Sequence, residues 1–184
     1  MKILHIISVI VLLLPGSMAY AEGALPNPVL MIIDSAGHFP PLAGDNLNEK
    51  QVVLPNDLSA QRTLVLIAFE RAQASVLDSW SKGLDLPNSQ IPWIETPIIS
   101  SPFKLGSMFI ASGMRRGIPN PAVRERVITL YTDRAAFAKA MGFEYDKNEA
   151  YVAIIDHSGK NLGMVKGAYD EAKAKAVLAL LGEK

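Results

Sequence analysis

Residues 63–69 constrain the fold more than any other stretch of this chain, because they form a continuous apolar and β-branched run. A strand has this composition when both faces of its sheet are covered. A helical pattern follows at once and stops at Gly83, and its inward positions have the spacing of one helix face: Gln73, Val76, Leu77 and Trp80. A buried strand followed directly by a helix begins a β-α-β unit, so we expect an α/β fold.

Further strands are predicted from apolar or alternating runs at residues 51–55, 91–99, 127–131, 151–155 and 161–166. The first is typical of an edge strand, and the prolines in the second predict a bulge or an edge at those points. The last two flank a turn that begins at Asp156, which predicts a hairpin.

Helical patterns separate these strands at residues 105–112, 122–126, 133–140 and 170–181. Residues 113–121 break the first pattern, Thr132 or Asp133 caps the third, and Gly142 ends it. Asp170 caps the last helix, and we expect four of its residues to face inward: Ala174, Val177, Leu178 and Leu181. The whole pattern predicts a three-layer sandwich with a central mixed β-sheet flanked by helices.

The N-terminus predicts a cleavable secretory signal. Lys2 supplies a basic start, residues 6–14 form an apolar run too short to cross a bilayer, and Ala19 and Ala21 are the small residues that precede a cleavage site. We expect cleavage after Ala21 and a mature protein outside the cytoplasm, most simply in a bacterial periplasm. An uncleaved N-terminal anchor is the alternative. No later apolar run has membrane-spanning length, so we expect no integral membrane segment after cleavage.

The expected organisation is a signal peptide at residues 1–21, an N-terminal extension at 22–50 and one domain at 51–184. The extension is rich in Pro, Gly and Asn, carries a possible short strand at 29–33 and is expected to wrap the domain edge. Cleavage removes Lys2 and no acidic residue, so 17 of the 18 basic residues remain beside 18 acidic ones, a net charge of −1. This charge gives no field to attract nucleic acid or an anionic membrane, and we expect neither partner.

The chain contains no cysteine. Disulfide exchange, thiol peroxidase chemistry and nucleophilic catalysis by a thiolate all require the thiolate as the reacting species. The sequence therefore excludes these three reaction classes.

Two segments carry a family resemblance. Residues 151–160 run from a strand through Asp156 and a turn to Gly159 and Lys160, and residues 131–142 form a strand end and a capped helix. With residues 63–80, they resemble thioredoxin-like proteins of the peroxiredoxin and periplasmic-reductase type. The resemblance implies a thioredoxin-like fold.

The chain departs from those families at the place of their chemistry. They carry the reactive cysteine or cysteine pair at the start of the helix after the central strand, where the helix dipole lowers a thiol pKa. Residues 70–75 occupy that place here, and the position of the cis-proline that faces the cysteines falls at Glu149, Ala150 and Tyr151. Both halves of the redox site are missing, so the resemblance does not extend to catalysis.

A narrower resemblance concerns residues 114–119, 133–142, 151–156 and 167–171 in that order. They are similar to an assembly-factor family that helps build the membrane sector of mitochondrial ATP synthase. Members of that family resemble thioredoxin-fold proteins without redox cysteines that act as chaperones. Its mitochondrial setting does not match a secretory signal, so only the idea of a non-catalytic assembly or interaction protein is carried over.

The candidate binding residues are Glu70, Arg71, Gln73, Arg115, Arg116 and Tyr151. The first three lie where open α/β sheets bind ligands, beyond the carboxyl ends of the strands. A solvated surface pair is the alternative interpretation of Glu70 and Arg71. Arg115 and Arg116 belong, with Arg124 and Arg126, to the only basic cluster, which suits a phosphate or an acidic partner or forms an ordinary charged helix face.

We expect no catalytic residue, no metal site and no cofactor. Ser75 has no histidine placed as its base, and His38 and His157 lack the spacing of zinc ligands. Trp80 and Trp93 follow helix and strand periods, which predicts packing in the core.

Two classes of function remain open. The first is a non-catalytic thioredoxin-fold protein that binds a partner subunit or an extended polypeptide. The second is a small-molecule-binding protein or a non-thiol enzyme whose site is built around Arg71, Gln73 and the loop of Arg115 and Arg116. The second class predicts a concave polar pocket at those residues.

Overall fold

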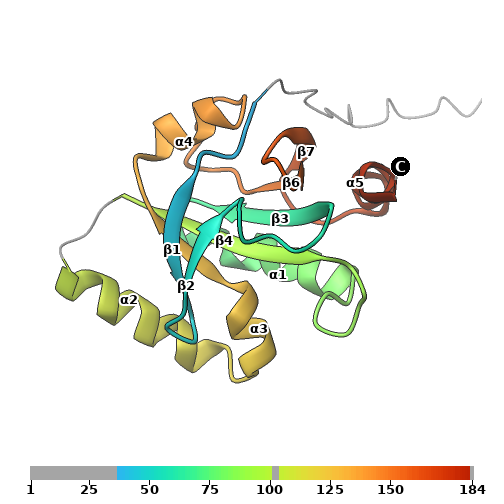
Figure 1. Ribbon diagram of the computed structural model, residues 1–184. Coiled ribbons are helices and arrows are strands. Elements are labelled where there is room, and N and C mark those ends of the chain that lie inside the picture. Colours follow the sequence, from blue (N-terminus) through green and yellow to red (C-terminus); the bar gives the residue numbers. More distant parts are fainter. Residues whose placement is uncertain (1–36, 101–103, 183–184) are drawn as a thin grey trace, which may run out of the picture.

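The computed structural model describes residues 37–100 and 104–182, with the backbone alone for residues 104–109. The expected signal and the possible strand at 29–33 lie outside the described residues. A seven-stranded mixed sheet forms the centre of the molecule, in the order β2-β1-β5-β4-β3-β6-β7 (Figure 1). The strands are β1 (Leu42–Asn46), β2 (Gln51–Leu54), β3 (Arg62–Ala68), β4 (Trp93–Ile99), β5 (Ile128–Tyr131), β6 (Tyr151–Asp156) and β7 (Asn161–Lys166). The helices are the 3-10 turn η1 (Arg71–Gln73), α1 (Ala74–Gly83), α2 (Lys104–Gly117), α3 (Pro121–Arg126), α4 (Arg134–Ala140) and α5 (Glu171–Gly182).

Helices cover both faces of this sheet, which confirms the three-layer sandwich. On one face, the inward side chains of β3 and β6 pack against Leu77 and Trp80 of α1 and against Ala174 and Val177 of α5. On the other face, the core includes Phe137 of α4. Each face of the sheet therefore has its own apolar core, as a strand buried on both sides requires.

β3 is the central strand that the apolar run predicts. It pairs in parallel with β4 and antiparallel with β6, and every residue from Thr63 to Phe69 is buried. The helix that follows confirms the β-α-β unit, because Trp80 of α1 is fully buried against the sheet. Trp93 is also buried, at the start of β4.

β4 lies inside the sheet, so the expectation of an edge there is wrong. Its pairing with β5 is interrupted between the bridge of Glu95 to Val127 and the pair of Ile98 with Leu130. Thr132 donates to the Ile99 carbonyl on this side, and alternation places the nitrogen of Pro97 on the same side. Pro97 has no N–H to give to β5, and only this local stretch of the ladder is lost.

Residues 42–46, which the sequence analysis assigns to the N-terminal extension, form β1 between β2 and β5. Gly44 allows this position, because a Cβ there would lie 2.4 Å from the Thr129 carbonyl oxygen. The sequence Leu-Ala-Gly-Asp-Asn has no β-branched residue, and this explains why its pattern does not indicate a strand.

Two helices differ in detail from their predictions. α2 continues through Gly113 to Gly117, although residues 113–121 were expected to break it. A glycine inside a helix costs only about 1 kcal/mol, and Gly113 has open space around it. In α5, Leu180 packs with Leu181 against the core, in the role that the helix period had predicted for Leu178.

Among residues 37–100 and 104–182, no helix is both long enough and apolar enough to cross a bilayer.

Candidate functional site

Gln73 lies within residues 70–75, the segment where the resemblance places the reactive cysteines of thiol enzymes. It is 4% exposed and lies at the end of η1, just beyond the carboxyl end of β3. Its Oε1 accepts hydrogen bonds from the backbone N–H groups of Phe69 (2.7 Å) and Glu70 (3.1 Å). Its Nε2 donates to the carbonyl oxygens of Lys147 (2.9 Å) and Glu149 (2.8 Å). Both N–H donors of the amide and both lone pairs of its oxygen are thus used, and they join the β3-α1 loop to the loop before β6.

Phe69 fills the interior beneath this amide. Its ring lies 5.1 to 6.3 Å from four other aromatic rings, all in edge-to-face contacts: Phe137, Phe143, Tyr145 and Tyr151. Edge-to-face packing of this kind stabilises a core beyond its simple burial. The interior beneath Gln73 is therefore filled by aromatic packing.

Tyr151 belongs to this packing and is 4% exposed. Its hydroxyl donates to the Glu144 carbonyl oxygen at 3.3 Å. Burial, reinforced by the carboxylates of Asp146 and Glu149, raises the pKa of Tyr151 to about 12. The phenol therefore stays protonated at physiological pH and acts as a packed hydrogen-bond donor.

An ion pair closes the rim of the same region. Glu70 is half-buried and pairs with the guanidinium of Arg134, the first residue of α4. Arg134 also donates to the Ile98 carbonyl oxygen at 3.3 Å, and the hydroxyl of Tyr145 lies 3.5 Å from the Glu70 carboxylate. The pair joins the ends of β3 and β4 to α4. Arg71 is exposed beside it, and its side chain makes no hydrogen bond or ion pair within the described part of the chain.

Arg115 and Arg116 do not join this region. Arg115 pairs with Glu49 in the turn between β1 and β2, and Arg116 is exposed at the end of α2. In the same turn, the Leu47 N–H donates to the carbonyl oxygen of Arg124 at 3.1 Å. Arg124 lies just before β5 in the chain. The start of β5 and the end of β3 lie at opposite edges of the sheet because β3, β4 and β5 run parallel. The expected site combining Arg71 and Gln73 with the loop of Arg115 is therefore not formed.

The other two arginines of the basic cluster hold backbone in place. Arg124 donates to the carbonyl oxygens of Ile118 (2.5 Å) and Arg115 (2.9 Å), which fixes the end of α2 against α3. Arg126 donates to the Trp93 carbonyl oxygen at 3.2 Å and lies 5.4 Å from the centre of the Trp93 ring. Of the four arginines, Arg115 is in an ion pair, Arg116 is exposed, and the other two bind backbone carbonyl oxygens. They therefore do not act together as one anion-binding patch.

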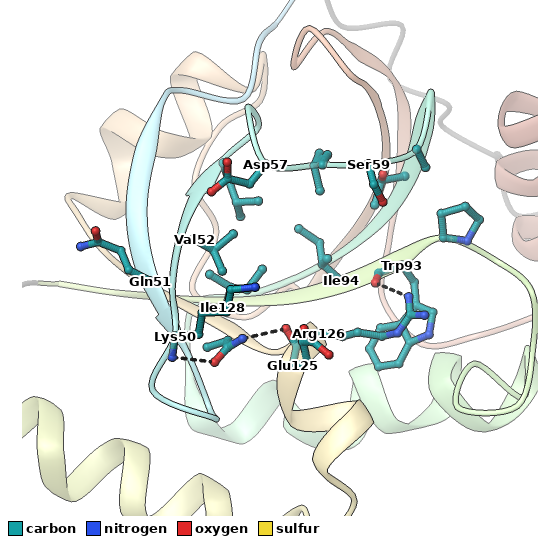
Figure 2. A pocket seen from close by; sticks show the side chains of 16 residues that line it. Lys50, Gln51, Val52, Asp57, Ser59, Trp93, Ile94, Glu125, Arg126 and Ile128 are labelled. Atoms are coloured by element: carbon teal, nitrogen blue, oxygen red, sulfur yellow. Dashed lines mark hydrogen bonds between the residues drawn. The ribbon is translucent and has the colours of Figure 1, made fainter.

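Gln73 lies beyond the carboxyl end of β3, whereas a larger hollow, shown in Figure 2, lies at the amino edge of the parallel strands. Its volume is about 580 Å³, and it is bounded by β2, the loop after it, and the beginnings of β3, β4 and β5. A smaller hollow of about 200 Å³ lies beside Thr129 and Arg115. Neither is lined by Glu70, Arg71 or Gln73, so the concave polar pocket expected there is not one of them. In the described ranges, no three His, Asp or Glu side chains are grouped to hold a metal ion.

Solved structures share this arrangement at low sequence identity. A protein described as an electron transfer protein from Aquifex aeolicus matches with a TM-score of 0.59 at 10% identity, over 80% of this chain and 94% of that one. An exposed lipoprotein thioredoxin from Streptococcus pneumoniae matches with a TM-score of 0.50 at 13% identity, over 79% of this chain and 100% of that one. The chain has a thioredoxin-like fold.

A second Aquifex aeolicus protein, described as an electron transport protein, shares the thioredoxin-like fold with a TM-score of 0.57 at 9% identity, over 79% of this chain and 96% of that one. No protein-family model matches the sequence, and no curated protein resembles it significantly. The thioredoxin-like fold expected from residues 63–80, 131–142 and 151–160 is confirmed, and the chain has this fold with no cysteine.

Sequence reasoning found Gln73 but not its contacts. Its partners lie 74 and 76 residues further along the chain, and Arg134 is 64 residues from Glu70. The larger hollow was not predicted at all, because its walls come from separate segments with no common motif.

Proposed function

We propose that this protein is a non-catalytic binding protein, a thioredoxin-like fold that serves in protein interaction or assembly. One observation carries the proposal: in the segment where the resemblance places the redox cysteines, Gln73 is buried and its amide is fully bonded to backbone groups. A side chain so engaged neither attacks a substrate nor exchanges protons with one. The same bonds keep the fold rigid at a point where thiol enzymes need an accessible reactive atom.

We propose further that the mature protein acts in a bacterial periplasm. The support for this location is the N-terminal sequence, with Lys2, the apolar run of residues 6–14 and the small residues Ala19 and Ala21. The partner is expected to be a protein subunit or an extended polypeptide.

The alternative is a small-molecule-binding protein or a non-thiol enzyme near Arg71. Arg71 is exposed beside the ion pair of Glu70 with Arg134, which leaves one cation available there. Neither of the two hollows described above includes these residues, and this favours the interaction function.

Photo-crosslinking tests the proposed function. A photoreactive residue is placed at Arg71 in one variant of the mature protein, at Gln51 beside the larger hollow in a second, and at Lys175 on α5 as the control. All three side chains are exposed. We expect one envelope protein to be captured from Arg71 or Gln51, to be displaced by excess unlabelled protein, and not to be captured from Lys175. Failure of both positions to capture any protein above the control contradicts the proposal.

A further inference from the structure

The larger hollow lies on the sheet face that α4 covers, but at the opposite end of that face. α4 packs through Phe137, Ala138 and Met141 with the aromatic side chains near Phe69. The amino end of the face has no helix over it within the described residues (Figure 1). β2, the loop of residues 55–61 and the end of α3 lie beside it. This end of the sheet is where a further chain segment has room to lie.

The floor of the hollow is apolar. Ile94 of β4, Ile128 of β5 and the half-buried Val52 lie along it (Figure 2), and the half-buried Leu58 also lines the hollow. The volume of about 580 Å³ is in the size range of ordinary binding sites, and the lining combines this apolar floor with polar and charged side chains. Large apolar side chains of a ligand would lose contact with water here, which favours binding.

The rim of the hollow carries separated charges. Asp57 lies on one side of the view, and Lys50, Glu125 and Arg126 lie on the other (Figure 2). None of these four is in an ion pair with a described residue. One side of the rim is therefore acidic and the other has a net charge of +1, with the apolar floor between them.

Asp57 also limits how a ligand can attach. Its carboxylate accepts the Val53 N–H at 2.7 Å, and its own N–H donates to the Val53 carbonyl oxygen at 2.8 Å. These bonds occupy the outward backbone groups of Val53, in the middle of the edge strand β2. A partner strand therefore cannot extend the sheet along β2, and a ligand must be held by its side chains.

We propose that this hollow binds an extended polypeptide segment that places apolar side chains on Ile94 and Ile128, a basic side chain at Asp57 and an acidic side chain near Lys50 and Arg126. The inference rests on the proposed interaction function and names its site and the chemistry of its partner. Partner binding is thus placed at the amino edge of the sheet. At the carboxyl edge, Gln73 and the aromatic core fill the interior.

Pools of capped pentapeptides with three central apolar residues test the proposal by their effect on the amide NMR signals of the labelled full chain. One pool has a basic and an acidic end residue, a second has two basic ends, and a third has two serine ends. Peptide at about 1 mM detects dissociation constants of about 1 mM or below. We expect the first pool to shift the amide signals of Val52, Ile94 and Ile128 more than the other two pools do.

A charge reversal decides whether the rim selects the ligand. In Lys50→Glu, the affinity for the pool with opposite end charges should fall about fivefold, the scale of one favourable surface charge contact, while the pool with two basic ends gains affinity. Lys175→Glu, on the other face of the sheet, should leave both affinities unchanged. Equal binding of all pools by wild type and Lys50→Glu overturns the assignment of the charges.

Two other results separate this inference from the proposed function. Shifts confined to residues 69–73 would mean that polypeptide binding occurs at the carboxyl edge, so the inference fails and the function stands. No shift with any pool would contradict the hollow as a polypeptide site, and crosslinking at Arg71 alone would then decide the proposed function.

Discussion

At the scale of single residues, the side chain of Gln73 is unreactive and joins two loops through hydrogen bonds. A thiolate at the start of this helix would be activated by the helix dipole and by backbone N–H groups. In this chain, the nearby N–H groups of Phe69 and Glu70 donate to a neutral amide oxygen instead. The other half of the amide holds the loop before β6, where the resemblance placed a cis-proline.

Gln73→Ala should lower the free energy of unfolding by about 2–4 kcal/mol, because it leaves a buried backbone N–H and two carbonyl oxygens without partners. Urea unfolding followed by tryptophan fluorescence measures the change. The matched control is Gln90→Ala, at an exposed loop position, which should stay within about 0.5 kcal/mol of wild type. Equal effects of the two substitutions would show that the amide bonds of Gln73 contribute nothing to stability.

Glu95 is the residue whose ionisation the fold opposes. It is on β4, two positions after Trp93, and so lies on the sheet face covered by α1. Burial, reinforced by Asp78 of α1, raises the pKa of Glu95 from 4.5 to about 7. Within the described ranges, the carboxyl has no hydrogen bond or ion pair that would offset this cost.

The stability of the protein should therefore fall as pH rises through this window. Between pH 4.5 and about 7, the native state keeps a proton that the unfolded state has lost, so the free energy of unfolding decreases with increasing pH. Glu95→Gln removes this pH-dependent term, so its free energy of unfolding should exceed that of wild type by about 3 kcal/mol at about pH 8, and the difference should vanish near pH 4.5. Denaturant unfolding at several pH values measures it. A constant difference across the range would contradict a raised pKa, and Glu144→Gln, at an exposed position, is the control.

At the scale of elements, glycines decide where chains approach closely and where they do not. In β1, Gly44 lies so near β5 that an added Cβ would be 2.4 Å from the Thr129 carbonyl oxygen and 2.8 Å from Leu130 Cδ2. In α2, no atom lies within 4 Å of the Cβ position of Gly113. The same residue type is thus required in one element and only tolerated in the other.

Gly44→Ala and Gly113→Ala should change stability in opposite directions. The first should destabilise the protein by at least about 2 kcal/mol, because the backbone of β5 must move. The second should stabilise it by about 0.5–1 kcal/mol, because alanine favours the helix and reduces the freedom of the unfolded chain. Thermal and urea unfolding of both variants measure the pair. A stabilising Gly44→Ala would mean that β1 does not pack against β5 as closely as described.

At the scale of the whole molecule, a thioredoxin-like fold persists without the chemistry that commonly accompanies it. Two apolar cores on either side of β3 hold the sheet, and no cysteine contributes to stability or to reactivity. The rim near Gln73 is closed by an ion pair and an aromatic interior, while the larger hollow opens at the other edge. The larger hollow and the packed region around Gln73 therefore lie at opposite edges of the sheet.

The wild-type protein should not accelerate the reduction of insulin disulfides by dithiothreitol above the uncatalysed rate, since no thiolate is present to attack. Substituting cysteine for both Ala72 and Ser75 places two thiols at the start of α1 and is the minimum change from which activity is expected. The turbidity of precipitating insulin chains measures the rate. Catalysis by wild type would contradict a non-redox function.

Local sequence determined most of the elements of this protein, β1 excepted, and only the tertiary structure determined how they combine. The run at 63–69, the caps at Asp133 and Asp170 and the missing cysteines could be read directly, because periodicity and capping depend on residues within a few positions of each other. The partners of Gln73, the insertion of β1 beside β5 and the walls of the hollow depend on segments far apart in the chain. Such contacts follow from the order in which strands join the sheet, and an isolated sequence pattern carries no record of that order.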